Sequence, residues 1–409
     1  MNKLGLLAMV LGAAACDSNQ SGNTSASSTG DTSHPAERRS PLDEVNAACG
    51  TGQLTQLGTS ALVRQPYLQQ VEANRALIGW TGKVGGASAR VKLTKPDGTL
   101  VSMVTPESEP QVLLRGTSED QQWTQATALE PSSIYCYQVE SDSQALTERT
   151  GFKTAPAADS TAPVRFLAFG DSGGGGADQY ELEEQMLTVP YDLILHTGDV
   201  AYEEGTLAQY QANVFDVYAD LFRSIPFYPA AGNHDYKTLQ AEPFRDVFNL
   251  PGDSGEKWYS YNWGPAHFAA LDTEADYKTQ AVWLDQDLAA NPSPWKIVYM
   301  HRPPYSNGNH GSDTALRNVV APILKKHNVQ LVLAGHDHNY ERIKPQDGTT
   351  YVVTGGGGRG TYSVGSSGFT AFSEEVIHFV YGEIKGDELT LHAIDATGKE
   401  FDSVVIPRT

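Results

Sequence analysis

The sequence has 409 residues, enough for two folded domains of ordinary size. It is 40% hydrophobic and 19% charged, a composition typical of soluble globular proteins and unlike that of fibrous or disordered chains. The formal net charge of −20 argues against a nucleic-acid-binding surface and gives no help in attracting phosphate anions, so any phosphate chemistry would have to supply its own local positive charge, for example from bound metal ions.

Residues 1–16 have the pattern of an export signal. They combine one lysine, an apolar run and small residues before Cys16, and the run is too short to cross a membrane as a helix. The small residues before the cysteine resemble the bacterial lipoprotein signal, although Ala13 stands where Leu is usual. We therefore predict a periplasmic or cell-surface protein, bound to the membrane only through a lipid on Cys16; simple secretion is the alternative.

A flexible linker is predicted over residues 17–58. Up to about Pro41 the linker is composed of Ser, Thr, Asn, Gly and Asp with almost no large apolar residue, so it cannot build a core. If Cys16 is lipidated, Cys49 and Cys136 remain, and an exported protein can pair them as a disulfide. Two unpaired thiols are the alternative.

Residues 59–155 are predicted to form a small all-β domain. Short alternating segments such as ALIGW and SIYCYQVE are separated by turn signals such as KPDGT at the spacing of a β-sandwich. The stretch LEPSSIYCY places Leu129, Pro131 and Tyr135 like the tyrosine corner of fibronectin type III domains. The domain has no recognisable chemistry, so we expect a scaffold that shapes the substrate groove; carbohydrate or partner binding is the alternative.

Residues 162–409 are predicted to form an α/β domain. Its apolar segments each end in polar residues: VRFLAFGD, YDLILHTGD, FYPAAGNHD, WKIVYMH and VQLVLAGHDH. Such runs are typical of strands buried on both faces, and helices are expected over residues 178–187 and 314–327. The segment IHFVYGEIKGDELTLHAID predicts an antiparallel hairpin that turns at GD.

Five of these strand ends carry side chains that can bind metal ions. Each alone is commonly a turn or a buried polar residue, and the hypothesis depends on all five occurring in order. Because α/β sheets bind ligands at the carboxyl ends of their strands, dispersed residues can meet in one crevice. Oxygen and imidazole donors without cysteine suit two metals that share a carboxylate, and argue against a structural zinc. The predicted ligands are Asp171, Asp199, Tyr202, Asn233, His301, His336 and His338.

The five segments resemble the signature blocks of the purple acid phosphatases within the calcineurin-like metallophosphoesterases. The matching blocks are GDSG, GDVAY, GNHD, VYMH and GHDHNYER. Most of that superfamily has D-x-H in the first block, whereas here Gly173 replaces the His and Tyr202 supplies a phenol, as in the purple acid phosphatases. The resemblance implies a metallophosphoesterase β-sandwich flanked by helices, preceded by a fibronectin type III-like domain.

The resemblance also implies a binuclear metal centre that hydrolyses phosphate monoesters by attack of a metal-bound hydroxide. The ligands of such a centre would divide into an Fe(III) site with Asp171, Tyr202 and His338, a bridging Asp199, and a site for divalent Zn, Fe or Mn with Asn233, His301 and His336.

Two further histidines are candidate catalytic residues. His234 is predicted to hydrogen-bond the phosphate, and His310 to protonate the leaving alkoxide as general acid. Plant members carry a second histidine where this chain has Gly311, so proton delivery or substrate preference can differ. Arg342 is expected to have a structural role, and His196 is either a neighbour of the metal site or a core residue.

Two glycine-rich runs resemble nucleotide-binding motifs and are rejected as such. Residues 355–360, GGGGRG, satisfy G-x-G-x-x-G, but no helix is expected after them. Residues 173–176, GGGG, lack the Lys and Ser/Thr of a phosphate-binding P-loop, so these glycines are expected to let the backbone pass close to the metals.

The leading hypothesis is an acid phosphatase that acts on small phosphate monoesters. A phosphodiesterase or nucleotidase of the same superfamily is the alternative, and the pairing of Gly173 with Tyr202 and the preceding β domain count against it. A catalytically inactive surface binding protein is a third possibility, which the intact set of ligand positions disfavours.

Overall fold

A computed structural model describes residues 35–50, 62–83, 89–105, 112–114, 116–142, 144–252 and 254–408. The predicted signal peptide, its Cys16 and most of the predicted linker lie outside the described residues. No helix within those ranges is both long enough and apolar enough to span a membrane.

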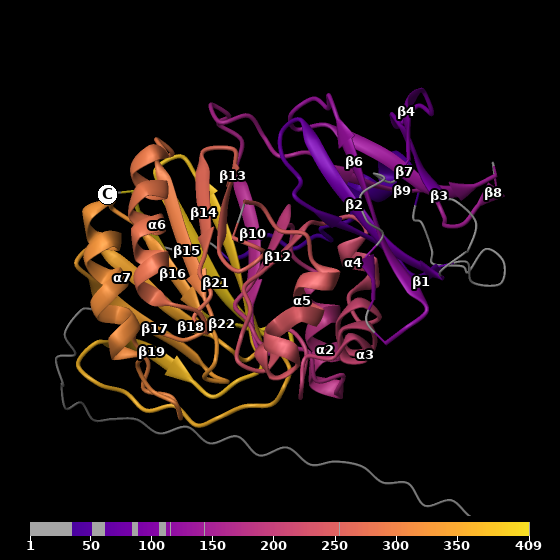
Figure 1. Cartoon of the computed structure of the whole chain (residues 1–409). Coiled ribbons are helices and arrows are strands. Elements are labelled where there is room, and N and C mark those ends of the chain that lie inside the picture. Colours follow the sequence, from indigo (N-terminus) through magenta and orange to yellow (C-terminus); the bar gives the residue numbers. More distant parts are fainter. Residues whose placement is uncertain are drawn as a thin grey trace, which may run out of the picture. The chain divides into compact units, whose positions relative to one another are not determined.

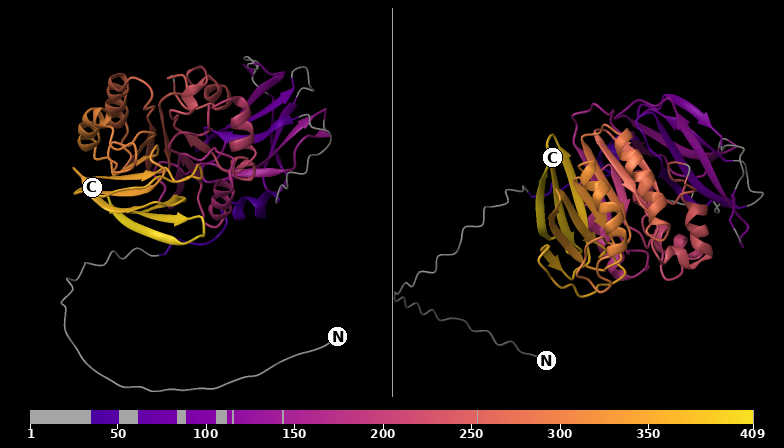
Figure 2. Two further views of the ribbon diagram at one scale, coloured as in Figure 1. Left: turned by 90° about the horizontal axis from the view of Figure 1, so that it is seen from below. Right: turned by 60° about the vertical axis from the view of Figure 1, so that its left-hand side comes forward.

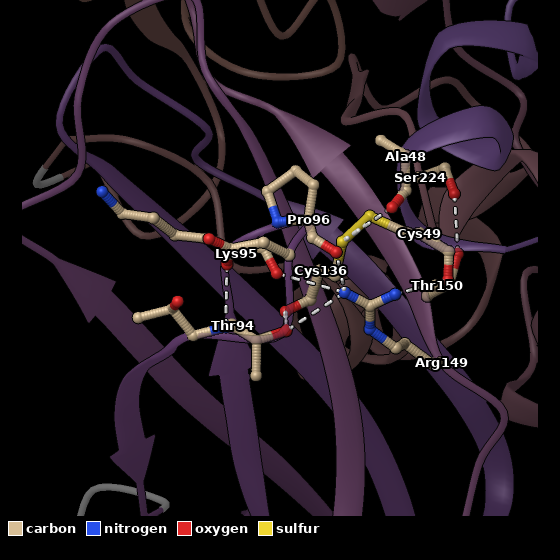
Figure 3. Close-up of a disulfide and its surroundings, with 11 residues drawn as sticks. Ala48, Cys49, Thr94, Lys95, Pro96, Cys136, Arg149, Thr150 and Ser224 are labelled. Atoms are coloured by element: carbon tan, nitrogen blue, oxygen red, sulfur yellow. Dashed lines mark hydrogen bonds between the residues drawn. A yellow bond between two sulfur atoms is a disulfide. The ribbon is translucent and has the colours of Figure 1, made fainter.

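The structure differs from the linker predicted over residues 17–58. Helix α1 (Asp43–Cys49) lies within that range, and its Val45 and Cys49 side chains are buried. Cys49 forms a disulfide with Cys136, with their Cα atoms 5.5 Å apart (Figure 3). Arg149 Nη1 donates to the Cys49 carbonyl over 3.0 Å. A short apolar helix face and a covalent bond thus hold a segment that lies after the polar stretch ending near Pro41 but within the range predicted to be a linker.

The next part of the chain folds as two antiparallel sheets, ordered β1-β2-β6-β5 and β4-β3-β7-β8, with β9 paired to β7. Tyr135 lies at the predicted corner, where its hydroxyl accepts from the Glu130 amide over 2.9 Å. Trp80 and Tyr137 are among the largest side chains buried here. The strands are β1 (Leu62–Gln69), β2 (Arg75–Lys83), β3 (Ala89–Thr94), β4 (Leu100–Val104), β5 (Val112–Leu113), β6 (Glu119–Thr127), β7 (Ile134–Ser141), β8 (Gln144–Ala145) and β9 (Thr150–Lys153).

The remaining strands form two larger sheets, ordered β12-β11-β10-β20-β21-β22 and β13-β14-β15-β16-β18-β17-β19. Strands β10, β11 and β12 are parallel, as are β14, β15, β16 and β18. The predicted hairpin is β20 paired with β21. The strands are β10 (Val164–Phe169), β11 (Leu193–His196), β12 (Phe227–Pro229), β13 (Tyr259–Trp263), β14 (Ala266–Ala270), β15 (Trp295–Met300), β16 (Leu331–Ala334), β17 (Tyr340–Gln346), β18 (Thr349–Thr354), β19 (Thr370–Glu374), β20 (His378–Lys385), β21 (Glu388–Asp395) and β22 (Glu400–Pro407).

Helices join these strands, and two of them correspond to the predicted helices 178–187 and 314–327. The helices are α2 (Ala177–Met186), α3 (Leu207–Tyr210), α4 (Ala219–Phe222), α5 (Glu242–Val247), α6 (Tyr277–Ala290) and α7 (Thr314–Lys326), with short helical turns η1 (Gln211–Phe215), η2 (Asp235–Lys237) and η3 (Leu239–Ala241). Figure 1 shows α6 and α7 side by side along strands β15 and β16.

The two large sheets pack face to face, and helices cover the outer face of the second. The ring of Phe166 on β10 lies 5.9 Å from that of Phe268 on β14. Along β15, Ile297 and Tyr299 belong to the core between the sheets, whereas Val298 and Met300 belong to a second core under α6 and α7. This alternation is the period-two pattern of a strand buried on both faces. The predicted metallophosphoesterase β-sandwich flanked by helices is therefore confirmed.

The N-terminal sheets contact the first large sheet at the start of its outermost strand, β12. Gln69 Nε2 donates to the Phe227 carbonyl over 2.7 Å, and Tyr137 OH donates to the Arg223 carbonyl over 2.7 Å. Phe227 begins strand β12, so these contacts hold the segment that leads to the third of the five polar strand ends. In both views of Figure 2 the yellow C-terminal strands lie on the side away from these purple N-terminal strands.

Candidate metal centre

The five polar strand ends belong to two different sheets. Asp171 follows β10, Asp199 and Asn233 follow β11 and β12, and these three strands are neighbours in the first sheet. His301 follows β15 and His336 follows β16 in the second sheet. The carboxyl ends of both sets of parallel strands meet, so the structure brings all seven predicted ligands together.

One group of donor atoms surrounds the phenol of Tyr202. The Tyr202 hydroxyl lies 3.1 Å from Asp171 Oδ1, 3.0 Å from Asp199 Oδ2 and 3.1 Å from His338 Nε2. His338 Nε2 is also 3.4 Å from Asp171 Oδ1. All four side chains are buried. These donors match the set predicted for the first metal together with the bridging carboxylate.

A second group of donor atoms surrounds His301. Its Nε2 lies 3.1 Å from Asn233 Oδ1, 3.2 Å from His336 Nδ1 and 3.4 Å from Asp199 Oδ2. The same oxygen, Asp199 Oδ2, therefore faces both groups. The ligating atoms of Asp199, His301 and His336 all lie within 4.8 Å of one another, a spacing that can hold a metal ion. One carboxylate oxygen between two donor sets is the arrangement that a binuclear metal centre requires.

The charges of these side chains call for bound cations. Burial and the neighbouring Asp171 and Asp199 charges raise the pKa of Tyr202 well above its usual value. Burial opposes protonation of His301, but the carboxylates of Asp199, Asp171 and Glu274 together outweigh it and raise the pKa of His301 to about 10. Burial, together with the charge on His301, lowers the pKa of His336 to about 2. Metal cations would replace these protons and let phenol, imidazoles and carboxylates all act as ligands, so the residues present fit such ions.

Gly173 makes room for the turn that carries Tyr202. A Cβ atom at this position would overlap the Val200 carbonyl oxygen and lie 2.8 Å from Ala201 Cα. The Tyr202 amide in turn donates to the Gly173 carbonyl over 2.9 Å. The absence of a side chain at 173 and the presence of a tyrosine at 202 are therefore parts of one packing arrangement.

Comparison with known proteins agrees with this geometry. Residues 164–340 match the protein family described as Calcineurin-like phosphoesterase. The chain contains a calcineurin-like metallophosphoesterase domain. It is 32% identical over 212 residues to acid phosphatase type 7 of Homo sapiens, a match that covers 44% of this chain and 48% of that protein. It is 28% identical over 305 residues to tartrate-resistant acid phosphatase type 5 of Homo sapiens, covering 61% of this chain and 93% of that protein.

The metallophosphoesterase domain and the preceding sheets also resemble a solved structure. A purple acid phosphatase from seeds of yellow lupin (Lupinus luteus) superposes with a TM-score of 0.75 at 20% identity, covering 85% of this chain and 75% of that one. At this identity the likeness concerns the fold. The chain spans about half (48%) of the length of the human type 7 relative.

Asp235 fixes two ligand-bearing loops of the metallophosphoesterase domain, and sequence reasoning missed it. Its carboxylate accepts from the amides of Val200 over 3.1 Å, Ala201 over 3.2 Å and Gly232 over 2.8 Å. It therefore joins the loop after β11 to the loop after β12. Burial and the nearby Asp199 charge raise the pKa of Asp235 to about 7. The aspartate that closes the block GNHD was the available signal.

Asp337 has a similar role for the loop of His310. It lies between the ligands His336 and His338 but is not itself one of the predicted ligands. Its Oδ1 accepts from the His310 amide over 2.7 Å and lies 3.1 Å from His310 Nδ1, while its Oδ2 accepts from Ser306 Oγ. The central aspartate of the block GHDH therefore orients the predicted general acid.

The two predicted catalytic histidines lie on different sides of the metal ligands. The His234 amide donates to Asp199 Oδ1 over 2.7 Å, and its ring faces a cleft of about 150 Å³ that Tyr202 also lines. The His310 ring is exposed, lies 4.0 Å from the His336 ring and lines a second cleft of about 400 Å³. Each histidine is thus within reach of a ligand bound at the centre.

The remaining predicted neighbours have structural partners. His196 is fully buried, with Nδ1 accepting from the Gly198 amide over 3.2 Å and Nε2 2.9 Å from Ser172 Oγ, so it is a core residue that also braces two ligand loops. Arg342 forms a two-point ion pair with Asp402, over 2.7 and 2.9 Å, in keeping with the structural role expected of it.

Proposed function

We propose that this protein is a binuclear metal-dependent acid phosphatase that hydrolyses small phosphate monoesters. The observation that carries the proposal is Asp199 Oδ2, which lies between the donors around Tyr202 and the donors around His301. The acid phosphatase names of its relatives agree with it.

The proposed metals are Fe(III) and a divalent ion. Fe(III) is assigned to the group with Tyr202, because a phenolate and carboxylates are hard donors. Zn, Fe or Mn is assigned to the group with His301, where imidazoles and the Asn233 amide predominate. When bound, two such ions supply Lewis acidity toward the phosphoryl group and activate water at moderate pH.

The protein groups would bind the phosphate and move protons. The His234 ring, which lies beside Asp199, would hydrogen-bond a phosphate oxygen. His310 would protonate the leaving alkoxide, and the contact of Asp337 with its Nδ1 supports this role by fixing the ring orientation. Asp235 keeps the two loops in register, so it acts as a positioning residue.

Two alternatives remain as outcomes of experiment. A phosphodiesterase or nucleotidase of the same superfamily is disfavoured by the steric coupling of Gly173 and Tyr202, which builds a phenol into the site. A catalytically inactive surface binding protein is disfavoured because all seven ligand positions converge. The N-terminal sheets are proposed to be a fibronectin type III-like scaffold, on the strength of the Tyr135 corner.

Export is part of the same proposal. A lipid on Cys16 would anchor the protein at the periplasmic or outer cell surface. The disulfide between Cys49 and Cys136 supports an oxidising compartment, since disulfides persist outside the reducing cytosol.

The test is a visible absorption spectrum with metal analysis on the same purified protein, followed by rates on mono- and diesters. We expect a tyrosinate-to-iron band that disappears in Tyr202→Phe and persists in Tyr362→Phe, a matched loss of one hydroxyl on a ring that stacks on His338. Faster diester than monoester cleavage would contradict the proposed substrate class. A colourless protein with two Zn or Mn ions would exclude the iron–tyrosinate centre.

A further inference from the structure

The glycine-rich run after β18 lies against the metal centre. A Cβ atom at Gly355 would overlap the Asp337 carbonyl oxygen, and one at Gly357 would overlap the Gly170 carbonyl oxygen. The backbone amide of Arg359 donates to the carbonyl of the ligand Asp171 over 3.0 Å. The run therefore passes between two ligand loops at contact distance and delivers Arg359 to the rim of the site.

The other glycine-rich run gives Arg359 its space. A Cβ atom at Gly174 would lie 2.7 Å from Arg359 Cδ, so the arginine stem crosses the position that a side chain there would occupy. The guanidinium carbon then lies 5.3 Å from the centre of the Tyr202 ring. The glycine runs at residues 173–176 and 355–360 thus together place the Arg359 guanidinium above the ring of the predicted ligand Tyr202.

Arg359 lines the 150 Å³ cleft together with Tyr202, His234 and His338. Its Nη2 donates to Glu203 Oε1 in an ion pair whose side chains are 42% and 49% exposed. Nε and Nη1 have no hydrogen bond to any other described residue. A guanidinium has five N–H donors and binds phosphate in a two-point geometry, and an exposed ion pair is weak.

The other cations at the rim are engaged differently. Arg302 binds Glu274 through two nitrogens, over 2.6 and 3.0 Å. Lys237 Nζ lies 3.0 Å from His234 Nδ1. Arg359 is held by one nitrogen only, which leaves its remaining donors for a ligand.

The ion pair is not needed to hold the loop in place. The Arg359 amide is bonded to Asp171, and the Tyr362 amide donates to the His338 carbonyl over 2.7 Å. The Tyr362 ring also stacks on the His338 ring, with centres 4.1 Å apart. The segment is therefore anchored on both sides of the guanidinium by contacts that do not involve Glu203.

We propose that Arg359 is a phosphate-binding residue of this site and that Glu203 is a built-in competitor that occupies its guanidinium until phosphate enters. The inference rests on the proposed phosphatase function. The chain has a formal net charge of −20, which gives no general attraction for phosphate anions. If Arg359 exchanges the Glu203 carboxylate for a phosphate oxygen, its positive charge attracts phosphate locally, at the site itself. Glu203 then sets how tightly the product phosphate is held.

The experiment is calorimetric titration of the metal-loaded protein with inorganic phosphate, with metal content measured for every variant. Arg359→Gln should weaken binding roughly tenfold, the effect of losing a charge-assisted hydrogen bond. Glu203→Gln should tighten binding roughly two- to fivefold, the strength of an exposed ion pair. The double variant should behave as Arg359→Gln, and Arg359→Lys should fall between wild type and Arg359→Gln. Glu204→Gln is the matched control, because it removes a neighbouring carboxylate that lies 3.9 Å from Lys237 Nζ and is not paired with Arg359.

Whether Glu203→Gln tightens or weakens phosphate binding distinguishes phosphate recognition by Arg359 from an ion pair that only holds the loop. If both single variants weaken phosphate binding alike, the pair only holds the loop and the inference is overturned. It is also overturned if Arg359→Gln binds phosphate as wild type does, or if Glu204→Gln tightens binding as much as Glu203→Gln. Turnover of a phosphate monoester by the same samples tests the proposed function separately, because phosphate binding with the expected signs requires no turnover.

Discussion

Replacing Gly173 with alanine is expected to displace the turn that carries Tyr202. The new Cβ would overlap the Val200 carbonyl oxygen, and its 2.8 Å separation from Ala201 Cα has to open to at least 3.4 Å for ordinary contact. The turn from Asp199 to Tyr202 must move by a comparable amount, because the residues just before Gly173, at the end of strand β10, are fully buried and cannot move away. Misplacement by about 1 Å near the reacting groups can cost about 100-fold in rate.

We therefore expect kcat/KM for a phosphate monoester to fall roughly 10- to 100-fold. Overpacking should also destabilise the protein by about 1–3 kcal/mol. The assays are monoester kinetics at saturating metal, thermal unfolding, and the visible spectrum as a direct readout of the Tyr202 position.

Gly176→Ala is the matched control, because a Cβ there has no neighbour within 4 Å and the glycine belongs to the same run. This variant should keep the wild-type activity and visible spectrum, and its free energy of unfolding should fall only slightly, because the change lies at the start of α2. Full activity and an unchanged spectrum in Gly173→Ala would refute the coupling of Gly173 with Tyr202, as would an equal loss in Gly176→Ala.

Three further predictions concern stability and location. Replacing Cys49 and Cys136 together by serine opens a loop with a sequence separation of 87 and should lower the free energy of unfolding by roughly 4–5 kcal/mol; an unchanged urea midpoint under non-reducing conditions would contradict this. Burial and the Asp220 charge raise the pKa of Glu183 to about 7 from 4.5. The folded state then binds this proton more tightly than the unfolded state, so stability falls as pH rises from about 4.5 to 7. Glu183→Gln should raise the free energy of unfolding by about 1–2 kcal/mol at pH 8 and leave it unchanged at pH 4, as measured by thermal unfolding. A stabilisation that does not depend on pH would contradict the raised pKa of Glu183. Cys16→Ser should shift the expressed protein from the membrane to the soluble fraction, and an unchanged distribution between the two fractions would contradict lipidation of Cys16.

Much of the fold could be predicted because its signals are local. The apolar runs that precede Asp171 and His301 are strands buried on both faces, and the residues just after them reach the site because every such strand ends at the same edge. The hairpin at residues 386–387 was evident from its turn residues. Helix α1 was missed, because its few apolar side chains gain stability from distant partners such as Cys136.

By itself the sequence determined which residues can bind metals and in what order they occur along the chain, since both follow from residue type and strand-end position. Only the tertiary structure decided that the ligands come from two sheets, that Asp199 Oδ2 lies between both donor groups, and that the two glycine runs meet around Arg359. The physical reason is that pairing between sheets and close backbone approach depend on packing between segments more than 100 residues apart, which no local pattern encodes.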